Sequence, residues 1–175
     1  MSFARVRALA FVGALAVAAI VFVVVAVVRD SQTGARAAEN CPAGWALADI
    51  RLPEPKDVHL RVSNGTLQPR LGERVADEFH NRRFQVDKKV GNAEKHFDGV
   101  ALLQYGPDGV GSAHLLRAYF LDATPQYNPK RKGAVVDVTV GDQFQKLGTS
   151  TEVNQAIGIL GEPTLPDHAC AKVQK

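Results

Sequence analysis

The chain has 175 residues, of which 46% are hydrophobic and 22% are charged, and its mean hydropathy is −0.08. This length accommodates one small folded domain, and the composition excludes collagen-like, repeat-array and wholly disordered proteins. Of the 21 basic residues, only Arg5 and Arg7 precede residue 29, so the remainder carries 19 basic and 18 acidic side chains. A nucleic-acid binder of this size normally has a large basic excess on one face. We therefore expect no nucleic-acid partner.

Residues 8–28 form a run of 21 positions without a charged side chain. As an α-helix rising about 1.5 Å per residue, the run would reach roughly 31 Å, which is enough to cross the hydrocarbon core of a bilayer. Arg5 and Arg7 lie just before the run, and basic residues favour the cytoplasmic side. The sequence therefore predicts a cytoplasmic stub at 1–7, a single transmembrane helix at 8–28 in the plasma membrane, and an extracytoplasmic remainder.

A cleaved signal peptide is the alternative interpretation of the N-terminal segment. Ala35-Arg36-Ala37 fits a small-x-small cleavage site, but the apolar run is longer than the about 7–15 residues typical of a signal peptide. We favour the uncleaved anchor. Residues 29–56 are then expected to form an extracytoplasmic stalk that is small and polar at first and irregular from residue 41 onward.

The chain has two cysteines, Cys41 and Cys170, and both lie on the extracytoplasmic side in this topology. In an oxidising compartment an even pair predicts a disulfide, which would join the two ends of the folded domain. Two free thiols are the alternative. Two cysteines this far apart have no companion ligands, and the five histidines form no ligand motif, so we expect neither a metal site nor a cofactor.

From residue 58 onward, segments of period two alternate with segments of helical period. In chain order they predict a strand at 58–62, a helix at 69–79, a short strand at 84–86, a strand at 100–105, a helix capped by Ser112 and running to 120, a polar loop at 122–133 and a strand at 136–140. Thr149 and Glu152 then have the spacing of a capping box, which begins a last helix.

This order predicts an α+β protein, a β-α-β-β-α-β split sandwich with a mixed sheet and helices on one face. The folded domain is expected to span 57–146, and a C-terminal helix and tail to occupy 147–175.

Two glycine-containing turns precede the helices, and they are the candidates for ligand binding. A glycine-rich turn that enters a helix can cradle a phosphate, but neither turn has a complete nucleotide-binding motif, so simple turns are the favoured interpretation. A lone tryptophan can also stack on a sugar ring. The candidate binding residues are Asn64, Gly65, Thr66, Gly109, Gly111, Ser112 and Trp45. No nucleophile motif is present, so we assign no catalytic residue.

Three segments together resemble a known family. VHLRVSNGTLQPRLGERVADEFHNRRFQV (58–86), GVALLQYGPDGVGSAHLLRAYF (99–120) and GAVVDVTVGDQF (133–144) are similar to the LytR C-terminal domain. The resemblance departs from the family pattern at 68–72, where a Gly-Leu-Ala sequence is more usual. The arrangement behind one apolar segment, with flanking cysteines, is similar to stand-alone actinobacterial envelope-integrity proteins.

The resemblance implies a role in the cell envelope through binding or scaffolding. The stretch before residue 57 is too short for the phosphotransferase domain that accompanies this domain elsewhere, so the resemblance implies no catalysis. The expected partner is peptidoglycan or an attached wall polymer, or an envelope membrane protein, with the lipid bilayer contacted through 8–28. The alternatives are a protein scaffold that binds no glycan and an accessory subunit of a glycopolymer phosphotransferase.

Overall fold

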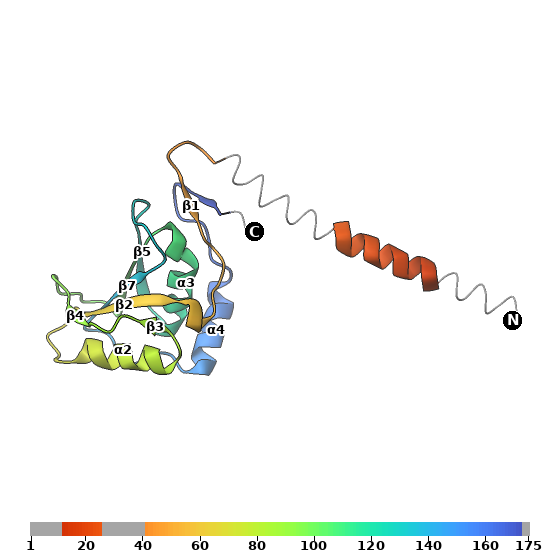
Figure 1. Cartoon of the computed structure of the whole chain (residues 1–175). Helices are drawn as coiled ribbons and strands as arrows, with labels where there is room; N and C mark the ends of the chain where they lie inside the picture. Colours follow the sequence, from red (N-terminus) through yellow and green to blue (C-terminus); the bar gives the residue numbers. More distant parts are fainter. Residues whose placement is uncertain (1–11, 26–40, 173–175) are drawn as a thin grey trace, which may run out of the picture. The chain divides into compact units, whose positions relative to one another are not determined.

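The computed structural model describes residues 12–25 and 41–172 (Figure 1). Residues 12–25 form a helix with exposed side chains, and Cys41–Lys172 form a separate compact unit. Among the described residues, no helix has both the length and the hydropathy needed to cross a membrane. The predicted transmembrane segment 8–28 begins and ends outside the described residues.

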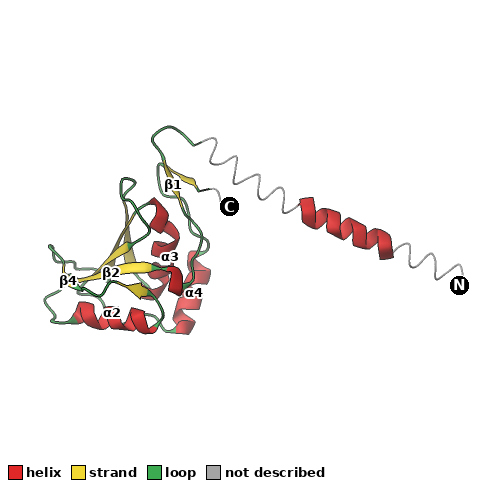
Figure 2. Cartoon of the chain, viewed as in Figure 1, coloured by secondary structure: helices red, strands yellow, loops and turns green. Residues whose placement is uncertain are grey.

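The Cys41–Lys172 unit is built on a six-stranded mixed sheet (Figure 2). Its strands are β2 (His59–Asn64), β3 (Gln85–Val86), β4 (Gly91–Asn92), β5 (Ala101–Tyr105), β6 (Ala123–Tyr127) and β7 (Val136–Val140). They lie in the order β3-β2-β7-β5-β6, and β4 pairs with β2. β2 is parallel to β3 and β7, and β5 is parallel to β6, but β5 and β7 are antiparallel. β2 and β5 therefore run in opposite directions on the two sides of β7.

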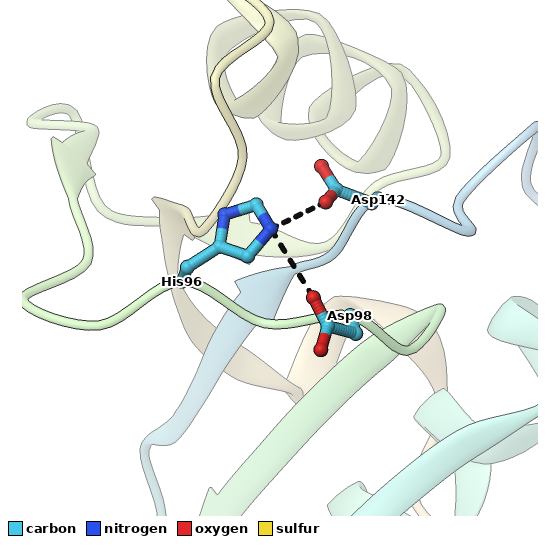
Figure 3. A group of neighbouring side chains, drawn as sticks. All are labelled: His96, Asp98 and Asp142. Atoms are coloured by element: carbon cyan, nitrogen blue, oxygen red, sulfur yellow. Dashed lines mark ion pairs between the residues drawn. The ribbon is translucent and has the colours of Figure 1, made fainter.

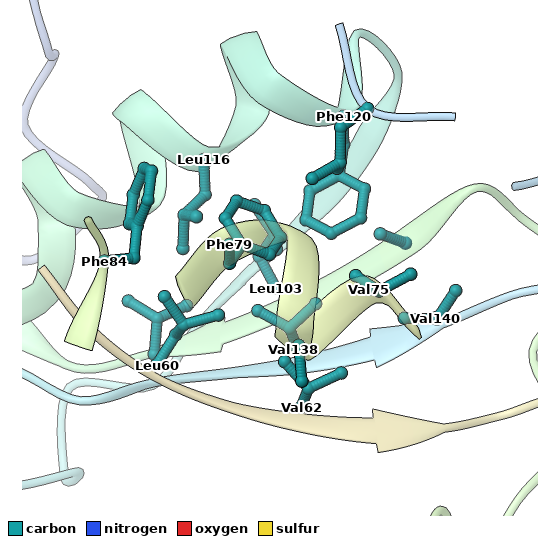
Figure 4. Packing of buried hydrophobic residues seen from close by; sticks show 14 of the residues in the cluster. Leu60, Val62, Val75, Phe79, Phe84, Leu103, Leu116, Phe120, Val138 and Val140 are labelled. Carbon is teal, nitrogen blue, oxygen red and sulfur yellow. The ribbon is translucent and has the colours of Figure 1, made fainter. Parts of the chain in front are cut away.

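Three helices accompany this sheet: α2 (Leu71–Asn81), α3 (Val110–Phe120) and α4 (Ser150–Leu160). α2 and α3 pack on the strands, and α4 packs against α3. α2 connects β2 to β3 and α3 connects β5 to β6, so each helix is the crossover of a parallel β-α-β unit. Figure 4 shows Phe79 of α2 and Phe120 of α3 against the strand residues of one shared hydrophobic cluster. Their ring centroids lie 5.4 Å apart, a separation typical of stabilising aromatic pairs.

The strands alternate between the helix-covered face and an open face. In β7 the side chains of Val136, Val138 and Val140 are buried in the cluster, whereas those of Asp137 and Thr139 are only half-buried. This is the pattern of a sheet covered on one side. The predicted α+β class, the mixed sheet and the placement of helices on one face are thereby confirmed.

The predicted succession of elements along the chain lacks one strand of the sheet. The polar segment 122–133, expected as a loop, contains β6, and the strand predicted to be last, β7, occupies the centre of the sheet. β6 is an edge strand with Pro125 at its middle, and an edge strand tolerates proline because one of its two sides has no neighbouring strand that needs an N–H donor. Its sequence lacks apolar alternation, since pairing with β5 rather than burial maintains it.

The segment expected to be irregular contains a second, two-stranded sheet. β1 (Ala46–Ala48) pairs in parallel with β8 (Ala169–Ala171). A disulfide joins Cys170, the middle residue of β8, to Cys41 with a Cα–Cα distance of 5.9 Å, so the predicted pairing is confirmed. We call residues 41–48 and 168–171, with their disulfide, the clasp.

The helix starts agree with prediction in one case and differ in another. Thr149 and Glu152 form the predicted capping box of α4, in which the Thr149 backbone N–H donates to the Glu152 carboxylate at 2.7 Å. Ser112 is not the cap of α3, because this helix begins at Val110 after the 3-10 turn Pro107–Gly109. The N-terminal segment provides an acceptor for a backbone N–H at the start of this helix: the Gly111 N–H donates to the Asp49 carbonyl at 3.0 Å.

Replacing both Cys41 and Cys170 by serine is expected to release the clasp. For the 129-residue separation that the disulfide closes, the chain-entropy model predicts a loss of about 4–5 kcal/mol in the free energy of unfolding. Trp45, the only tryptophan, packs edge-on against His168 in the clasp, so its fluorescence reports this region. Far-UV circular dichroism should keep its native signal at 25 °C. Unchanged thermal stability, in the double variant or in reduced wild type, would contradict this prediction.

The capping box should make stability depend on pH in the acid range. Hydrogen bonds from the Thr149 backbone and hydroxyl, and then from Lys146, lower the pKa of Glu152 to about 2. A carboxyl with a lowered pKa stabilises the fold above its ordinary pKa of 4.5, and this contribution is lost as the pH falls toward 2. Melting temperatures of wild type and Glu152→Gln should therefore converge over this interval. If the difference between the two melting temperatures did not change with pH, the ionised Glu152 carboxylate would make no contribution to stability.

Candidate functional site

The open face of the sheet carries two rows of side chains across the strands, and all of them except Leu102 are polar. Strand register aligns Arg61, Asp137, Gln104 and Gln126 in one row, from β2 through β7 and β5 to β6. The same register aligns a second row, which consists of Ser63, Thr139, Leu102 and Thr124. These are the side chains that alternate with the buried core residues, so the pleat that builds the core also displays the rows.

The charges in the first row compensate one another. Asp137 accepts a hydrogen bond from Arg131 at 2.7 Å and lies 3.5 Å from the guanidinium of Arg61. Arg61 also donates to Asp87 at 3.0 Å, and the carboxylates of Asp87 and Asp137 raise the pKa of Arg61. The Asp137 Oδ1 atom is buried and accepts no hydrogen bond. The centre of the face is therefore polar without a large excess of either charge.

All members of these rows except Thr124 form the floor of a groove with a cavity volume of about 620 Å³. Residues 92–97, which run from the last residue of β4 to Phe97, form one wall and contribute the half-buried ring of Phe97. A second hollow of about 290 Å³ continues from Gln104 and Gln126 to Tyr127, Asn128 and Arg131. The two hollows share Gln104 and Gln126, so together they offer an extended surface across the face.

Two glycines fix the position of the Phe97 wall. A Cβ on Gly141 would clash with the Gly99 carbonyl and would lie 2.6 Å from the Phe97 ring. A Cβ on Gly99 would lie 2.7 Å from the same ring. The backbone also holds the segment, because the Phe97 N–H donates to the Gly65 carbonyl and the Asp142 N–H donates to the Phe97 carbonyl, both at 3.0 Å.

Beside this wall, the structure brings together His96, Asp98 and Asp142 (Figure 3). His96 Nε2 lies 2.5 Å from Asp142 Oδ2 and 3.2 Å from Asp98 Oδ1. One ligand atom of each residue lies within 4.8 Å of the others, and all three residues are exposed. Such nitrogen and oxygen atoms can coordinate a divalent cation, but they also satisfy one another as an ion-paired group. The expectation that the protein has no metal site stays a prediction.

The first predicted turn is held by its own hydrogen bonds. The Asn64 side chain accepts from the Thr66 N–H at 3.1 Å and donates to the Gln68 carbonyl at 2.8 Å, which forms an Asx turn. A Cβ on Gly65 would lie 2.6 Å from the Thr139 methyl group and 2.8 Å from the Val140 carbonyl. These contacts account for the residues at 64–66 through close packing at the end of β2.

The second predicted turn is covered by the chain itself. Gly109, Gly111 and Ser112 are buried, and a Cβ on Gly111 would overlap the carbonyl of Arg51. Because β2 and β5 run in opposite directions, the two turns lie at opposite ends of the sheet and do not form one site. Trp45, 43% exposed, lies in the clasp next to His168. The predicted roles of the two turns and of Trp45 in ligand binding stay predictions.

Sequence reasoning missed the open-face residues, although a signal for them exists. The alternation that predicts β2 and β7 also identifies Arg61, Ser63, Asp137 and Thr139 as the outward positions. Their alignment with Gln104 and Gln126 depends on the register between non-consecutive strands, which one sequence does not contain.

Comparisons with known proteins identify the family. The model of the LytR C-terminal family, which is described as "LytR cell envelope-related transcriptional attenuator", matches residues 57–144. The chain belongs to the LytR C-terminal family. This confirms the resemblance noted from the sequence. No curated protein matches the chain.

A solved structure supports the fold assignment of this LytR C-terminal domain. It is the crystal structure of the soluble domain of a conserved hypothetical secreted protein from Mycobacterium marinum. The two chains are 18% identical, the TM-score is 0.52, and the match covers 69% of this chain and 83% of the other. At this identity the likeness shows a common fold.

Gly141→Ala is expected to displace the Phe97 wall of the groove. A methyl group has no room between the Gly99 carbonyl and the Phe97 ring, and such overpacking costs about 1–3 kcal/mol in the free energy of unfolding. Gly158→Ala is the matched control, because nothing lies within 4 Å of its added Cβ on α4. It should stabilise by about 0.5–1 kcal/mol through helix propensity. Equal effects of the two changes on urea unfolding would contradict the packing argument.

Proposed function

We propose that this LytR C-terminal protein is a non-catalytic cell-envelope protein whose extracytoplasmic domain binds a cell-wall glycan on the open face of the sheet. The observation that carries the proposal is the groove of about 620 Å³ lined by hydroxyl, amide and charge-compensated side chains. Saccharides are rich in hydroxyl groups that both donate and accept hydrogen bonds. Ser63, Thr139 and the two glutamines offer partners of both kinds.

The balance of charge favours an uncharged polymer over a strongly anionic one. Arg61 lines the groove and Arg131 lines the adjoining hollow, and Asp137 engages both guanidiniums. An anion that bound there would have to displace a carboxylate from this arrangement. The apolar ring of Phe97 on the groove wall adds a surface against which the carbon face of a sugar can pack.

The location in the envelope is supported by independent features. The family description refers to the cell envelope, and the Mycobacterium marinum neighbour is described as a secreted protein. The disulfide suits an oxidising compartment outside the cytoplasm. Residues 8–28 would serve as the anchor in the plasma membrane, with Arg5 and Arg7 on the cytoplasmic side.

The groove also supports binding rather than bond cleavage. Glycoside hydrolysis uses two carboxyl groups that flank the scissile bond. Among the strand residues that line the groove, Asp137 supplies the carboxylate, and two guanidiniums engage it. Glu94 lies on the exposed wall segment instead.

Protein scaffolding is the second candidate function, and a separate surface favours it. Leu121, Ala156, Ile159 and Leu160 line an apolar hollow of about 380 Å³ beside α4. Ile159 is 79% exposed there, and its apolar neighbours in the hollow make it part of a patch, which is the arrangement typical of an interaction surface. An envelope membrane protein, including a glycopolymer phosphotransferase that this chain assists, would be the partner.

Co-sedimentation with purified cell wall tests the proposed function. The fragment 41–175 contains the whole compact unit and its disulfide, and it should pellet with peptidoglycan, with polymer-bearing wall, or with both. Leu102→Trp fills the half-buried floor of the groove and should reduce the bound fraction at least about 10-fold, the equivalent of about 1.4 kcal/mol. Leu67→Trp, at a position 91% exposed outside the groove, should bind as wild type does.

Comparison of the two wall preparations identifies the polymer. Equal binding by Leu102→Trp and Leu67→Trp would remove the groove as the site. Failure of the folded, oxidised wild-type fragment to sediment with either preparation would overturn glycan binding and leave scaffolding as the favoured function.

A further inference from the structure

The side-chain amides of Gln104 and Gln126 form a pair at the point where the two hollows of the open face meet. Gln104 Nε2 donates to Gln126 Oε1 at 2.7 Å, and strand register places the two residues opposite each other on β5 and β6. Both residues line both hollows. A ligand that extends from one hollow to the other therefore passes over this pair.

The pair presents a defined hydrogen-bonding pattern to such a ligand. Its internal bond uses a donor of Gln104 and an acceptor of Gln126, which leaves Gln104 Oε1 as an acceptor and Gln126 Nε2 as a donor. Within residues 41–172 neither of these atoms is engaged in another hydrogen bond. A trans secondary amide directs its N–H and its C=O to opposite sides, so one acetamido group can donate its N–H to Gln104 Oε1 or accept at its C=O from Gln126 Nε2, and a neighbouring group of the glycan can bond the other atom. Exchanging oxygen and nitrogen in both side chains gives the same pattern.

We infer that the Gln104–Gln126 pair recognises the acetamido group of an N-acetylated sugar in a glycan that spans both hollows. This inference rests on the proposed glycan-binding function and specifies its substrate class. An acetamido group supplies the secondary amide, and the sugar ring supplies hydroxyl groups for Ser63 and Thr139 in the larger hollow. An extended peptide also contains secondary amides, but it needs pockets for alternate side chains, and Leu102 is the apolar strand residue on the floor.

The test compares two tetrasaccharides that differ at the group in question. One is the β-1,4 tetramer of N-acetylglucosamine, and the other is the β-1,4 tetramer of glucose, which has a hydroxyl group in place of each acetamido group. Each is titrated into the ¹⁵N-labelled 41–175 fragment and followed by NMR. The N-acetylated tetramer should bind at least about 10-fold more tightly, a difference of about 1.4 kcal/mol. It should also shift the side-chain NH₂ resonances of Gln104 and Gln126.

Variants show whether the amide pair is responsible. Gln126 is exposed at the sheet edge, so Gln126→Met keeps the side-chain length, removes the amide and should leave folding unchanged. It should bind the two tetramers with similar affinity, and Gln104→Met should do the same. Gln145→Met is the matched control, because Gln145 is exposed and lines neither hollow. It should keep the preference for the N-acetylated tetramer.

The outcomes separate this inference from the proposed function. Equal affinity of wild type for the two tetramers, or an undiminished preference in Gln126→Met, overturns acetamido recognition while glycan binding stands. Sedimentation with cell wall without binding of either tetramer also overturns acetamido recognition alone. Tighter binding of an N-acetylated wall tetrapeptide than of either sugar overturns the choice of occupant. Failure to bind the tetramers, together with failure to sediment with wall, overturns both the inference and the function.

Discussion

The pairing of β7 with β2 on one side and β5 on the other is the constraint on which the rest of the domain depends. The β2-α2-β3 and β5-α3-β6 units each have a strand pair and one helix, which is too little to bury a core alone. β7 joins them into one sheet, so Phe79 of α2 and Phe120 of α3 meet over the same buried valines. The same pairing sets the two polar rows of the opposite face in register, which links the candidate site directly to the core.

The antiparallel pairing of β5 with β7 also decides where a site cannot form. It directs the C-terminal ends of β2 and β5 to opposite ends of the sheet, so the turns at 64–66 and 109–112 face different regions. In a doubly wound sheet the corresponding turns lie at the same edge and can bind one ligand together. Here the residues of the first turn satisfy one another, and the N-terminal segment covers the second. Binding is therefore left to the middle of the open face.

Local patterns in the sequence predicted the features that depend on local physics. Alternation located β2 and β7, and the spacing of Thr149 and Glu152 located the start of α4. Local patterns did not predict β6, because this segment is a strand only through its pairing with β5. Its proline and polar residues are typical of a loop. β1 and β8 are three residues each and depend on the disulfide and on each other. Alternation within each strand identifies the groove residues as outward-facing positions. Their neighbours on the adjacent strands depend on the register of pairing, which the sequence does not contain.

At the starts of α3 and α4, groups of the protein itself occupy backbone positions that could otherwise bind an anion. The Asp49 carbonyl accepts the Gly111 N–H at the start of α3, and the Glu152 carboxylate accepts the Thr149 N–H at the start of α4. Helix N-termini are favourable anion sites when such groups are free. On the open face Asp137 engages both guanidiniums. With these positions filled by the protein itself, the hydrogen-bonding groups left on the groove floor are neutral amides and hydroxyls, and such groups select a ligand by the geometry of its hydrogen bonds rather than by its charge.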